Sequence, residues 1–527
     1  MTLTGQPYST RTMNLGQFLT QAAALYPQHD VLIRGEKKVT FEALGKRVDA
    51  ACHALTARGV QKGDRVLVQS RNSFAMFEAM FAVWKLGAVL VPVNFRLTPD
   101  DVAYIAGNCG ASVLLYEPLF EDHRAAIDKA VVLNLTIALS PVEGVEDWDA
   151  VVASASDDRF PSCAVDRDDP CWFFFTSGTT GHPKAAVLTH GQMNFVVTNY
   201  LADLFPGLDA DRDASLVVAP LSHGAGIHQI AQVARGVVSV FPQGQRFDPA
   251  EVFALIEEHK ITNAFTVPTI LKTLVEHEAV DRFDHSSLRH LIYAGAPMFR
   301  VDQRRALEKL GPCIVQYFGL GEVTGNITVF PAHRHHVDDE QQGRIGSCGT
   351  ARAGMQVQIQ DDDGVELPAG ETGEICVIGP AVFAGYYNND EANAKAFRNG
   401  WFRTGDRGHM DEAGFVYITG RESDMYISGG SNIYPREIEE KLLEHPAVSD
   451  CAVVGMPDDK WGEVGVAALV VTPDFDEAEF HAWMEQKIAS YKRPRRVELF
   501  DALPVSGYGK VTKKLVRAAL EERLKGE

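Results

Sequence analysis

Short apolar runs rich in β-branched residues alternate with helical patterns from the N-terminus to about Gly420. The helical patterns include 249–259 and 302–310. Strand-like runs separated by helices predict an α/β fold, in which helices cover largely parallel sheets. The runs predicted to be strands are 65–69, 112–116, 216–219, 237–241, 263–267 and 290–293.

The most apolar stretch of the sequence, 74–93, contains Glu78 and Lys85. Because a membrane span needs an almost uncharged run of about 20 residues, we predict a buried helix followed by a strand. The N-terminal residues 1–14 also lack the apolar core of a signal peptide. The sequence therefore predicts no transmembrane segment.

The pattern changes after about Gly420 and becomes that of a compact α+β unit of about a hundred residues, within the usual range for a domain. The elements predicted there are a hairpin at 425–430, helices at 435–444 and 477–490, and strands at 451–454 and 464–471. The expected organisation is a large N-terminal domain of layered α/β subdomains over 1–420, a hinge at 421–424 and a small domain over 425–527.

Composition and charge narrow the functional classes. At 527 residues the chain is too long for one ordinary core, which agrees with two or more domains. Its formal charge of −20 disfavours a nucleic-acid partner, since such proteins are normally basic. Its eight cysteines are scattered without a C-x-x-C pair, so we expect neither a zinc site nor disulfides, and we predict a cytoplasmic protein.

The strongest candidate for chemistry is the segment 173–184, in which an apolar run leads into hydroxyl residues, glycines and Lys184. Glycines let backbone N–H groups approach phosphate oxygens, hydroxyls add donors, and a lysine adds a point charge. It is not a Walker P-loop, because only two residues separate Gly178 from Gly181 where that motif has four. The alternative is a polar surface turn.

The run from Thr176 to Lys184 resembles the phosphate loop of the adenylate-forming superfamily, which contains acyl- and aryl-CoA synthetases, peptide-synthetase adenylation domains and luciferases. Further segments follow in the family's order over 41–514. The resemblance implies an AMP-forming acid–CoA ligase that uses ATP, Mg²⁺ and coenzyme A. It also implies that the small C-terminal domain is mobile.

Several segments resemble the parts of the family that bind ATP. Glu322 would hold magnesium with Thr176, Phe318 would stack on adenine, and Asp406 would accept from both ribose hydroxyls, since a carboxylate can accept two hydrogen bonds. The full set implied for ATP is Thr176, Ser177, Gly178, Thr179, Thr180, Gly181, Lys184, Gly295, Ala296, Pro297, Tyr317, Phe318, Gly319, Asp406 and Arg421.

The acyl pocket implied by the resemblance has His223 at its mouth, although a histidine beside small residues is also compatible with a satisfied loop residue. Gly321 replaces the family's usual threonine, which removes a hydroxyl and is expected to enlarge the pocket. His228 either contacts a polar substituent or is structural, and the structural alternative is favoured. The residues implied for the pocket are His223, Gly224, Ala225, His228, Gly295, Gly319, Leu320, Gly321 and Thr324.

The small domain would supply the thiol substrate and the last catalytic group. The residues implied for coenzyme A are Ser428, Gly429, Gly430, Tyr434 and Pro435. Ser423 stands at the hinge position, and Lys510 matches the lysine that bridges the carboxylate and the α-phosphate. Together with Lys184, His223 and Glu322, Lys510 completes the predicted catalytic set. Rotation about the hinge would replace Lys510 by the coenzyme A segment between the two half-reactions.

The pocket segments carry no lysine or arginine, which disfavours a dicarboxylate and favours an aryl or medium-chain monocarboxylic acid. A longer fatty acid, or an amino acid loaded onto a carrier protein, is the alternative. A luciferase-like oxygenase and a non-catalytic nucleotide sensor are more distant rivals. The histidines and aspartates of 333–339 are interpreted as a solvated loop in preference to a metal site, and the oligomeric state is left open, a homodimer included.

Overall fold

The computed structural model describes residues 9–176, 183–244, 246–296, 298–429, 431–458, 460–505 and 511–525. A six-stranded sheet in the N-terminal part has the order β10-β9-β5-β4-β6-β7. Its strands run parallel, except that β9 and β10 form an antiparallel pair. Its strands are β4 (Arg65–Gln69), β5 (Val89–Val93), β6 (Val113–Tyr116), β7 (Leu135–Ala138), β9 (Pro170–Thr176) and β10 (Lys184–Thr189).

A second, larger sheet has a parallel half, in which β11 lies between β12 and β13 and β2 pairs with β12. The bounds in this half are β2 (Asp30–Arg34), β11 (Ala214–Leu216), β12 (Val238–Val240), β13 (Asn263–Thr266), β14 (His290–Tyr293) and β15 (Ile314–Phe318), and β3 (Lys37–Thr40) pairs antiparallel with β2. Five of the six strands predicted from the apolar runs coincide with strands of the two sheets, and the one predicted at 216–219 shares only Leu216 with β11. The α/β fold class is therefore confirmed.

The other half of this sheet is antiparallel and was not predicted. Its strands are β16 (Thr328–Phe330), β17 (Ser347–Ala351), β18 (Gln356–Gln360), β19 (Gly373–Ile378), β20 (Phe397–Arg398), β21 (Trp401–Met410) and β22 (Phe415–Arg421). Strand β21 shows why: its buried positions alternate, but they include Thr404, Asp406 and Gly408. The period of two is therefore hidden from a search for apolar residues.

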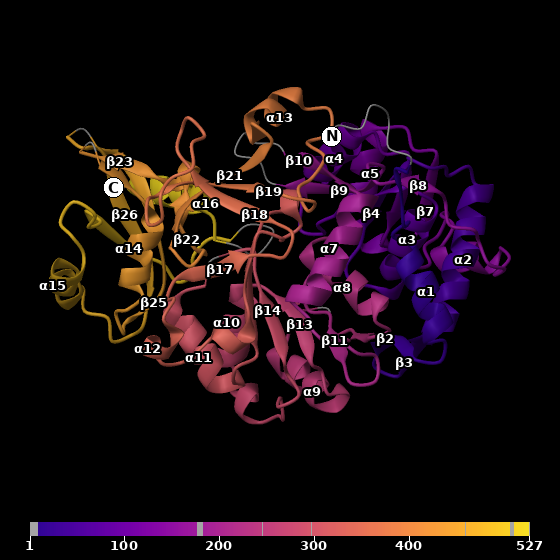
Figure 1. Cartoon of the computed structure of the whole chain (residues 1–527), viewed down its shortest axis with the longest axis horizontal. Coiled ribbons are helices and arrows are strands. Elements are labelled where there is room, and N and C mark those ends of the chain that lie inside the picture. Colours follow the sequence, from indigo (N-terminus) through magenta and orange to yellow (C-terminus); the bar gives the residue numbers. More distant parts are fainter. Residues whose placement is uncertain are drawn as a thin grey trace, which may run out of the picture.

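Helices fill the layer between the two sheets, where α7 and α8 lie near the centre of the molecule (Figure 1). Helices of the N-terminal part are α1 (Gln17–Leu25), α2 (Phe41–Ala57), α3 (Phe74–Lys85), α4 (Pro99–Cys109), α5 (Glu121–Ala130), α6 (Trp148–Ala153), α7 (His190–Asp203), α8 (Gly224–Ala234), α9 (Pro249–His259), α10 (Pro268–Glu276), α11 (Arg300–Leu310), α12 (Asp339–Gln342) and α13 (Asp390–Ala396).

The stretch 74–93 is a buried helix, α3, followed by strand β5, as predicted. Its two charges are paired inside the protein: Glu78 accepts from Arg47 at 2.6 Å and from Trp148 Nε1 at 2.8 Å, and Lys85 pairs with Asp49. A buried charge of this kind needs its partner, because an unpaired one is costly. Among the described helices, none is long and apolar enough to cross a bilayer.

The C-terminal part is an α+β unit that lies at one end of the molecule (Figure 1). Its sheet has the order β24-β23-β26-β25, with β27 beside β26. The bounds are β23 (Tyr426–Ser428), β24 (Ser431–Ile433), β25 (Val448–Asp458), β26 (Gly462–Val471), β27 (Arg496–Leu499), α14 (Pro435–Leu442), α15 (Glu477–Lys487) and α16 (Lys513–Lys525). The predicted hairpin, strands and two helices are present, and the proposed hinge 421–424 overlaps the short 3₁₀ helix Glu422–Asp424.

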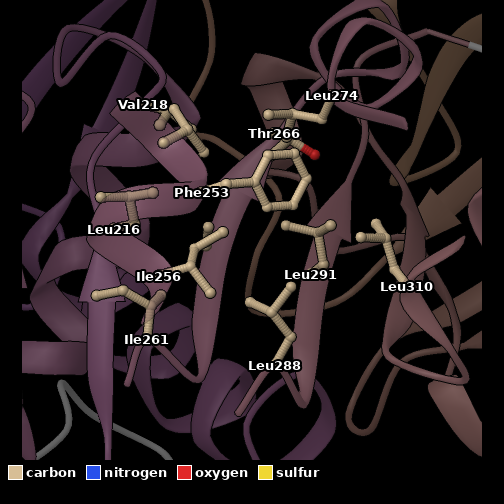
Figure 2. Close-up of a pocket in the computed structure, with 12 residues that line it drawn as sticks. Leu216, Val218, Phe253, Ile256, Ile261, Thr266, Leu274, Leu288, Leu291 and Leu310 are labelled. Carbon is tan, nitrogen blue, oxygen red and sulfur yellow. The ribbon is translucent and has the colours of Figure 1, made fainter. Parts of the chain in front are cut away.

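A small cavity lies inside the core beneath α9 and not at the candidate site (Figure 2). Its walls are leucine, isoleucine, valine, phenylalanine and alanine side chains from β11, β13, β14 and the helices that cover them. Thr266 adds the one hydroxyl, and it donates to Ile292 O at 2.8 Å. With its single polar side chain already satisfied, this cavity is a packing gap in the core.

The buried histidines make stability depend on pH. Burial lowers the pKa of His190 to about 4 and the pKa values of His228 and His335 to about 3. Below pH 6.5 these histidines bind protons in the unfolded chain but not in the folded one. For each of them, the free energy of unfolding should therefore fall by up to about 1.4 kcal/mol for every pH unit below 6.5. Urea unfolding followed by tryptophan fluorescence at pH 7.5 and 5.5 measures this loss.

His228→Asn should lower the number of protons taken up on unfolding by about one. The free energy of unfolding should then change less steeply with pH, whatever the substitution does to absolute stability. Gln229→Asn, a change on the same helix that removes no titratable group, is the matched control and should leave the slope unchanged. An identical slope in wild type and His228→Asn would contradict the assignment.

Candidate active site

Three predicted site residues meet at the edge of the six-stranded sheet. Thr176 ends β9 and lies opposite Lys184, the first residue of β10. Glu322 belongs to the 3₁₀ turn Gly321–Val323 and is only 5% exposed. The Thr176 hydroxyl donates to Glu322 Oε1 at 2.8 Å. Segments far apart in sequence therefore bring a hydroxyl, an ammonium and a buried carboxylate together.

A fourth residue of this cluster, Tyr386, was missed by the sequence analysis. Its hydroxyl donates to the same Oε1 atom of Glu322 at 2.9 Å, and the Lys184 ammonium lies 5.3 Å from the centre of its ring. Tyr386 carries no charge and belongs to no run of hydroxyls or glycines like that of 176–181, so the motif search had no reason to select it.

A second cluster lies on the antiparallel half of the large sheet. Asp406 on β21 is the register partner of Arg421 at the end of β22, and Arg421 Nε lies 3.0 Å from Asp406 Oδ1. Burial raises the pKa of Asp406, while the charge of Arg421 opposes that rise. The pKa of Arg421 is raised chiefly by Asp406 and also by Glu322. The charge of Glu322 in the first cluster therefore reaches Arg421 in the second.

The two aromatic residues predicted at the adenine site point to different faces of β15, because neighbouring side chains on a strand alternate. Tyr317 is buried. Its ring stacks on that of Phe265, with the ring centres 6.0 Å apart, and its centre lies 6.4 Å from that of the tilted Tyr200 ring. Phe318 is only partly buried. This geometry favours Phe318 as the side chain available for stacking and gives Tyr317 a packing role. Gly295 lies exposed after β14, and Ala296 is half-buried.

The residues predicted for the acyl pocket are closely packed. His223 precedes α8, and the Phe174 ring meets its imidazole edge-on at 5.4 Å. A Cβ atom on Gly224 would lie 2.8 Å from the Phe265 ring, and one on Gly226 would lie 2.1 Å from Leu221 O. These two glycines therefore permit close packing and do not leave open space beside His223. Ala225 and Thr324 are buried, whereas Gly319 and Leu320 are half-buried.

Gly321 does not enlarge the pocket. A Cβ atom there would lie 2.6 Å from the Phe174 ring and 2.8 Å from Thr176 Cγ2. The Phe174 ring occupies the space that a side chain at position 321 would take.

His228 is fully buried on α8, bonded weakly to Asn263 Oδ1 at 3.4 Å and edge-on to Phe205 at 4.5 Å. Both contacts fit the structural alternative for His228. Among the described residues, no group of three or more histidine, cysteine or acidic side chains is placed to hold a metal ion. The sequence predicts a solvated loop at 333–339, but one of its histidines is not solvated. His335 is buried there against Tyr293 and Phe330.

The C-terminal residues predicted for coenzyme A lie around the β23–α14 connection. Gly429 has a φ of +56° and packs against Trp461, where a Cβ atom would lie 2.8 Å from the ring. Ser428 ends β23, Tyr434 precedes α14, and Pro435 begins it. Ser423 is exposed, and its hydroxyl donates to Asp424 Oδ1 at 3.3 Å.

Some predicted site residues fall outside the described parts of the chain. They are Ser177, Gly178, Thr179, Thr180, Gly181, Pro297, Gly430 and Lys510.

Comparison with known proteins agrees with this geometry. The chain matches the family model for AMP-binding enzymes over residues 19–387 and that for the AMP-binding enzyme C-terminal domain over 437–510. It is 35% identical to a feruloyl-CoA synthase of Amycolatopsis sp, covering 96% of this chain and 99% of the relative. It is 31% identical to the long-chain-fatty-acid–CoA ligase FadD13 of Mycobacterium tuberculosis, covering 96% and 98%.

Among solved structures, the chain is similar to the o-succinylbenzoate CoA synthetase of Bacillus subtilis in complex with its acyl-adenylate intermediate. The TM-score is 0.83 at 30% identity, and the match covers 97% of this chain and 99% of that one. The family matches span most of the sequence and both parts of the fold. The chain therefore belongs to the AMP-binding enzyme family and is an AMP-forming acyl-CoA ligase that uses ATP, Mg²⁺ and coenzyme A.

Proposed function

We propose that this enzyme joins an aryl or medium-chain monocarboxylic acid to coenzyme A through an acyl-adenylate, at the site formed by Glu322 and the Asp406–Arg421 pair. The observation that carries the proposal is the cluster of Thr176, Lys184 and Glu322 within electrostatic reach of Arg421. In the first half-reaction the substrate carboxylate attacks the α-phosphorus of ATP and expels pyrophosphate. Lys184 and Lys510 stabilise the charge that develops on the phosphate oxygens.

The magnesium site is proposed at Glu322 and Thr176. The Thr176 and Tyr386 hydroxyls both donate to Oε1 of the Glu322 carboxylate. The other oxygen, Oε2, accepts from no described residue. Carboxylate and hydroxyl oxygens are hard donors of the kind that Mg²⁺ prefers, so these residues fit the ion. When bound, the ion would neutralise charge on the triphosphate.

The second half-reaction needs a thiol at the acyl carbonyl, where Lys510 would stand in the way. We propose that the small domain rotates about Ser423, removing Lys510 and bringing Gly429 and Gly430 forward with coenzyme A. Ser423 is exposed, and its side chain bonds only to its neighbour Asp424 among the described residues, so it supports a pivot at this position.

The acid is proposed from the aromatic character of the pocket. The rings of Phe174, His223 and Phe265 lie at or beside the positions assigned to it. Flat rings pack well against an aromatic substrate, and the feruloyl-CoA synthase relative acts on an aryl acid according to its name. A longer fatty acid is the second candidate, supported by the similarity to FadD13.

We further propose a cytoplasmic location, supported by the eight cysteines, all of which are described and unpaired. A homodimer is a hypothesis for which sedimentation of the purified protein is the test.

Pyrophosphate release should require an acid, and acyl-CoA should form only when coenzyme A is added. A panel of aryl, medium-chain and long-chain acids, assayed for pyrophosphate with and without coenzyme A, measures both steps. We expect kcat/KM to be highest for an aryl or medium-chain acid. A clear preference for long chains would favour the fatty-acid alternative, and no release with any acid would contradict the proposed function.

Lys510→Ala should lower the rate of adenylation about 10²- to 10³-fold, the usual effect of removing one group that stabilises the transition-state charge. Conversion of supplied acyl-AMP to acyl-CoA should be almost unchanged. Single-turnover assays of the two half-reactions separate these effects. Equal loss of both would contradict the alternation of Lys510 and coenzyme A at one site.

Gly321→Thr should destabilise the enzyme by about 1–3 kcal/mol and lower its activity, because the new side chain overlaps Phe174. Adding Phe174→Leu to Gly321→Thr should restore part of the lost stability and part of the lost activity. The interaction energy between the two substitutions should be about 0.5–3 kcal/mol. Thermal unfolding and kcat/KM of the single and double variants measure the coupling. Gly107→Thr, on α4 with only Val131 at 4.0 Å from the added Cβ, is the control, and additive effects would contradict direct contact.

A further inference from the structure

Tyr386 contacts two of the proposed catalytic residues from a segment that the family resemblance did not draw on. Its hydroxyl donates to Glu322 and its ring lies against the Lys184 ammonium. Both contacts involve charged groups of the candidate triphosphate site. This double contact raises the question of what holds Tyr386 in place.

The backbone around Tyr386 is attached to the strand that carries Lys184. Residues 384–387 pair with the edge of β10: Val187 N donates to Gly385 O at 2.9 Å, and Tyr387 N donates to Ala185 O at 2.9 Å. The side chain of Asn393, on α13, makes two further bonds to the backbone of Tyr386, at 2.6 Å and 3.0 Å. The backbone of Tyr386 is therefore held in a fixed position beside β10, the strand that begins with Lys184.

The same segment holds Glu322 by both its backbone and its side chain. Phe383 N donates to the Glu322 carbonyl oxygen at 2.8 Å, while Tyr386 donates to the carboxylate. The Phe383 ring packs edge-on against the Tyr386 ring at 4.8 Å. Two neighbouring contacts from one short segment thus restrict both the position and the rotation of Glu322.

The chemistry of the hydroxyl suits a permanent donor. A tyrosine hydroxyl ordinarily has a pKa of about 10, so at neutral pH it is an O–H group that can donate to the Glu322 carboxylate. The aromatic face attracts the Lys184 cation without removing any of its hydrogen-bond donors, which stay available to an anionic ligand.

We propose that Tyr386 is a positioning residue of the magnesium–triphosphate site, whose hydroxyl orients the Glu322 carboxylate and whose ring orients the Lys184 ammonium. This inference rests on the proposed function, because it assigns Tyr386 to the site where Glu322 and Lys184 act. The two contacts use different parts of one side chain, so they can be separated by substitution.

The test uses the full-length protein and a non-hydrolysable ATP analogue, without acid or coenzyme A. Isothermal titration at a series of Mg²⁺ concentrations gives the Mg²⁺ needed for half-maximal nucleotide affinity. Tyr386→Phe loses the hydroxyl and keeps the ring, so we expect that Mg²⁺ requirement to rise about tenfold, as for loss of a group that orients a metal ligand. Tyr386→Leu should also weaken nucleotide binding at saturating Mg²⁺, by roughly threefold, through loss of the contact with Lys184.

Tyr387→Phe is the matched control. Tyr387 is the next residue in the chain, and its ring packs against Phe173, with the ring centres 4.8 Å apart. Its Mg²⁺ requirement should equal that of the wild type. Removing the acceptor gives a further check: in a Glu322→Ala background, Tyr386→Phe should change the Mg²⁺ requirement much less than in the wild type.

An unchanged Mg²⁺ requirement in Tyr386→Phe, or an equal effect of the substitution with and without Glu322, would overturn the inference. Either outcome leaves the proposed function standing if the wild type still releases pyrophosphate with an acid. Conversely, a wild type that binds the nucleotide but adenylates no acid would contradict the proposed function, while the titration would still report on Tyr386.

Discussion

The site of this enzyme is built around a buried carboxylate, a group that is very costly to bury unless hydrogen-bond partners accompany it. Glu322 is almost inaccessible to solvent, yet it carries a charge that a metal ion would need. Hydroxyls from β9 and from the segment after β19 both reach it, and a backbone N–H holds its carbonyl. Segments separated by more than a hundred residues are thereby fixed relative to one another.

The antiparallel half of the large sheet supplies the Asp406–Arg421 pair through strand register. Because β21 and β22 are neighbours, Asp406 and Arg421 lie directly opposite each other. A slip of one residue in β22 would turn its side chains to the other face of the sheet and separate Arg421 from Asp406. The salt bridge is therefore a consequence of pairing in the sheet, and its charges are fixed without a mobile loop.

Much of this fold could be predicted from the sequence where apolar residues mark the buried face. The parallel strands and helix α3 have that property, as do the elements of the C-terminal part. Strand β21 does not, since it buries Thr404 and Asp406, and its antiparallel partners were missed. At the site, Thr176, Lys184 and Glu322 were found because their segments resemble known motifs. Tyr386 was missed, and the effect of Gly321 was misjudged, because both depend on a partner distant in sequence, Glu322 and Phe174 respectively.

Among the described residues, few polar groups join the two parts of the molecule. Lys272 donates to Ser449 O at 2.7 Å, and Phe299 packs on the C-terminal core. Burial raises the pKa of Asp406, and the charge of Arg436 on α14 opposes that rise. If the small domain rotates as proposed, a ligand that changes the charge around Asp406 would shift the balance of small-domain orientations. By thermodynamic reciprocity, the orientation would then alter affinity for that ligand by the same factor, and nucleotide occupancy and domain arrangement would form one linked equilibrium.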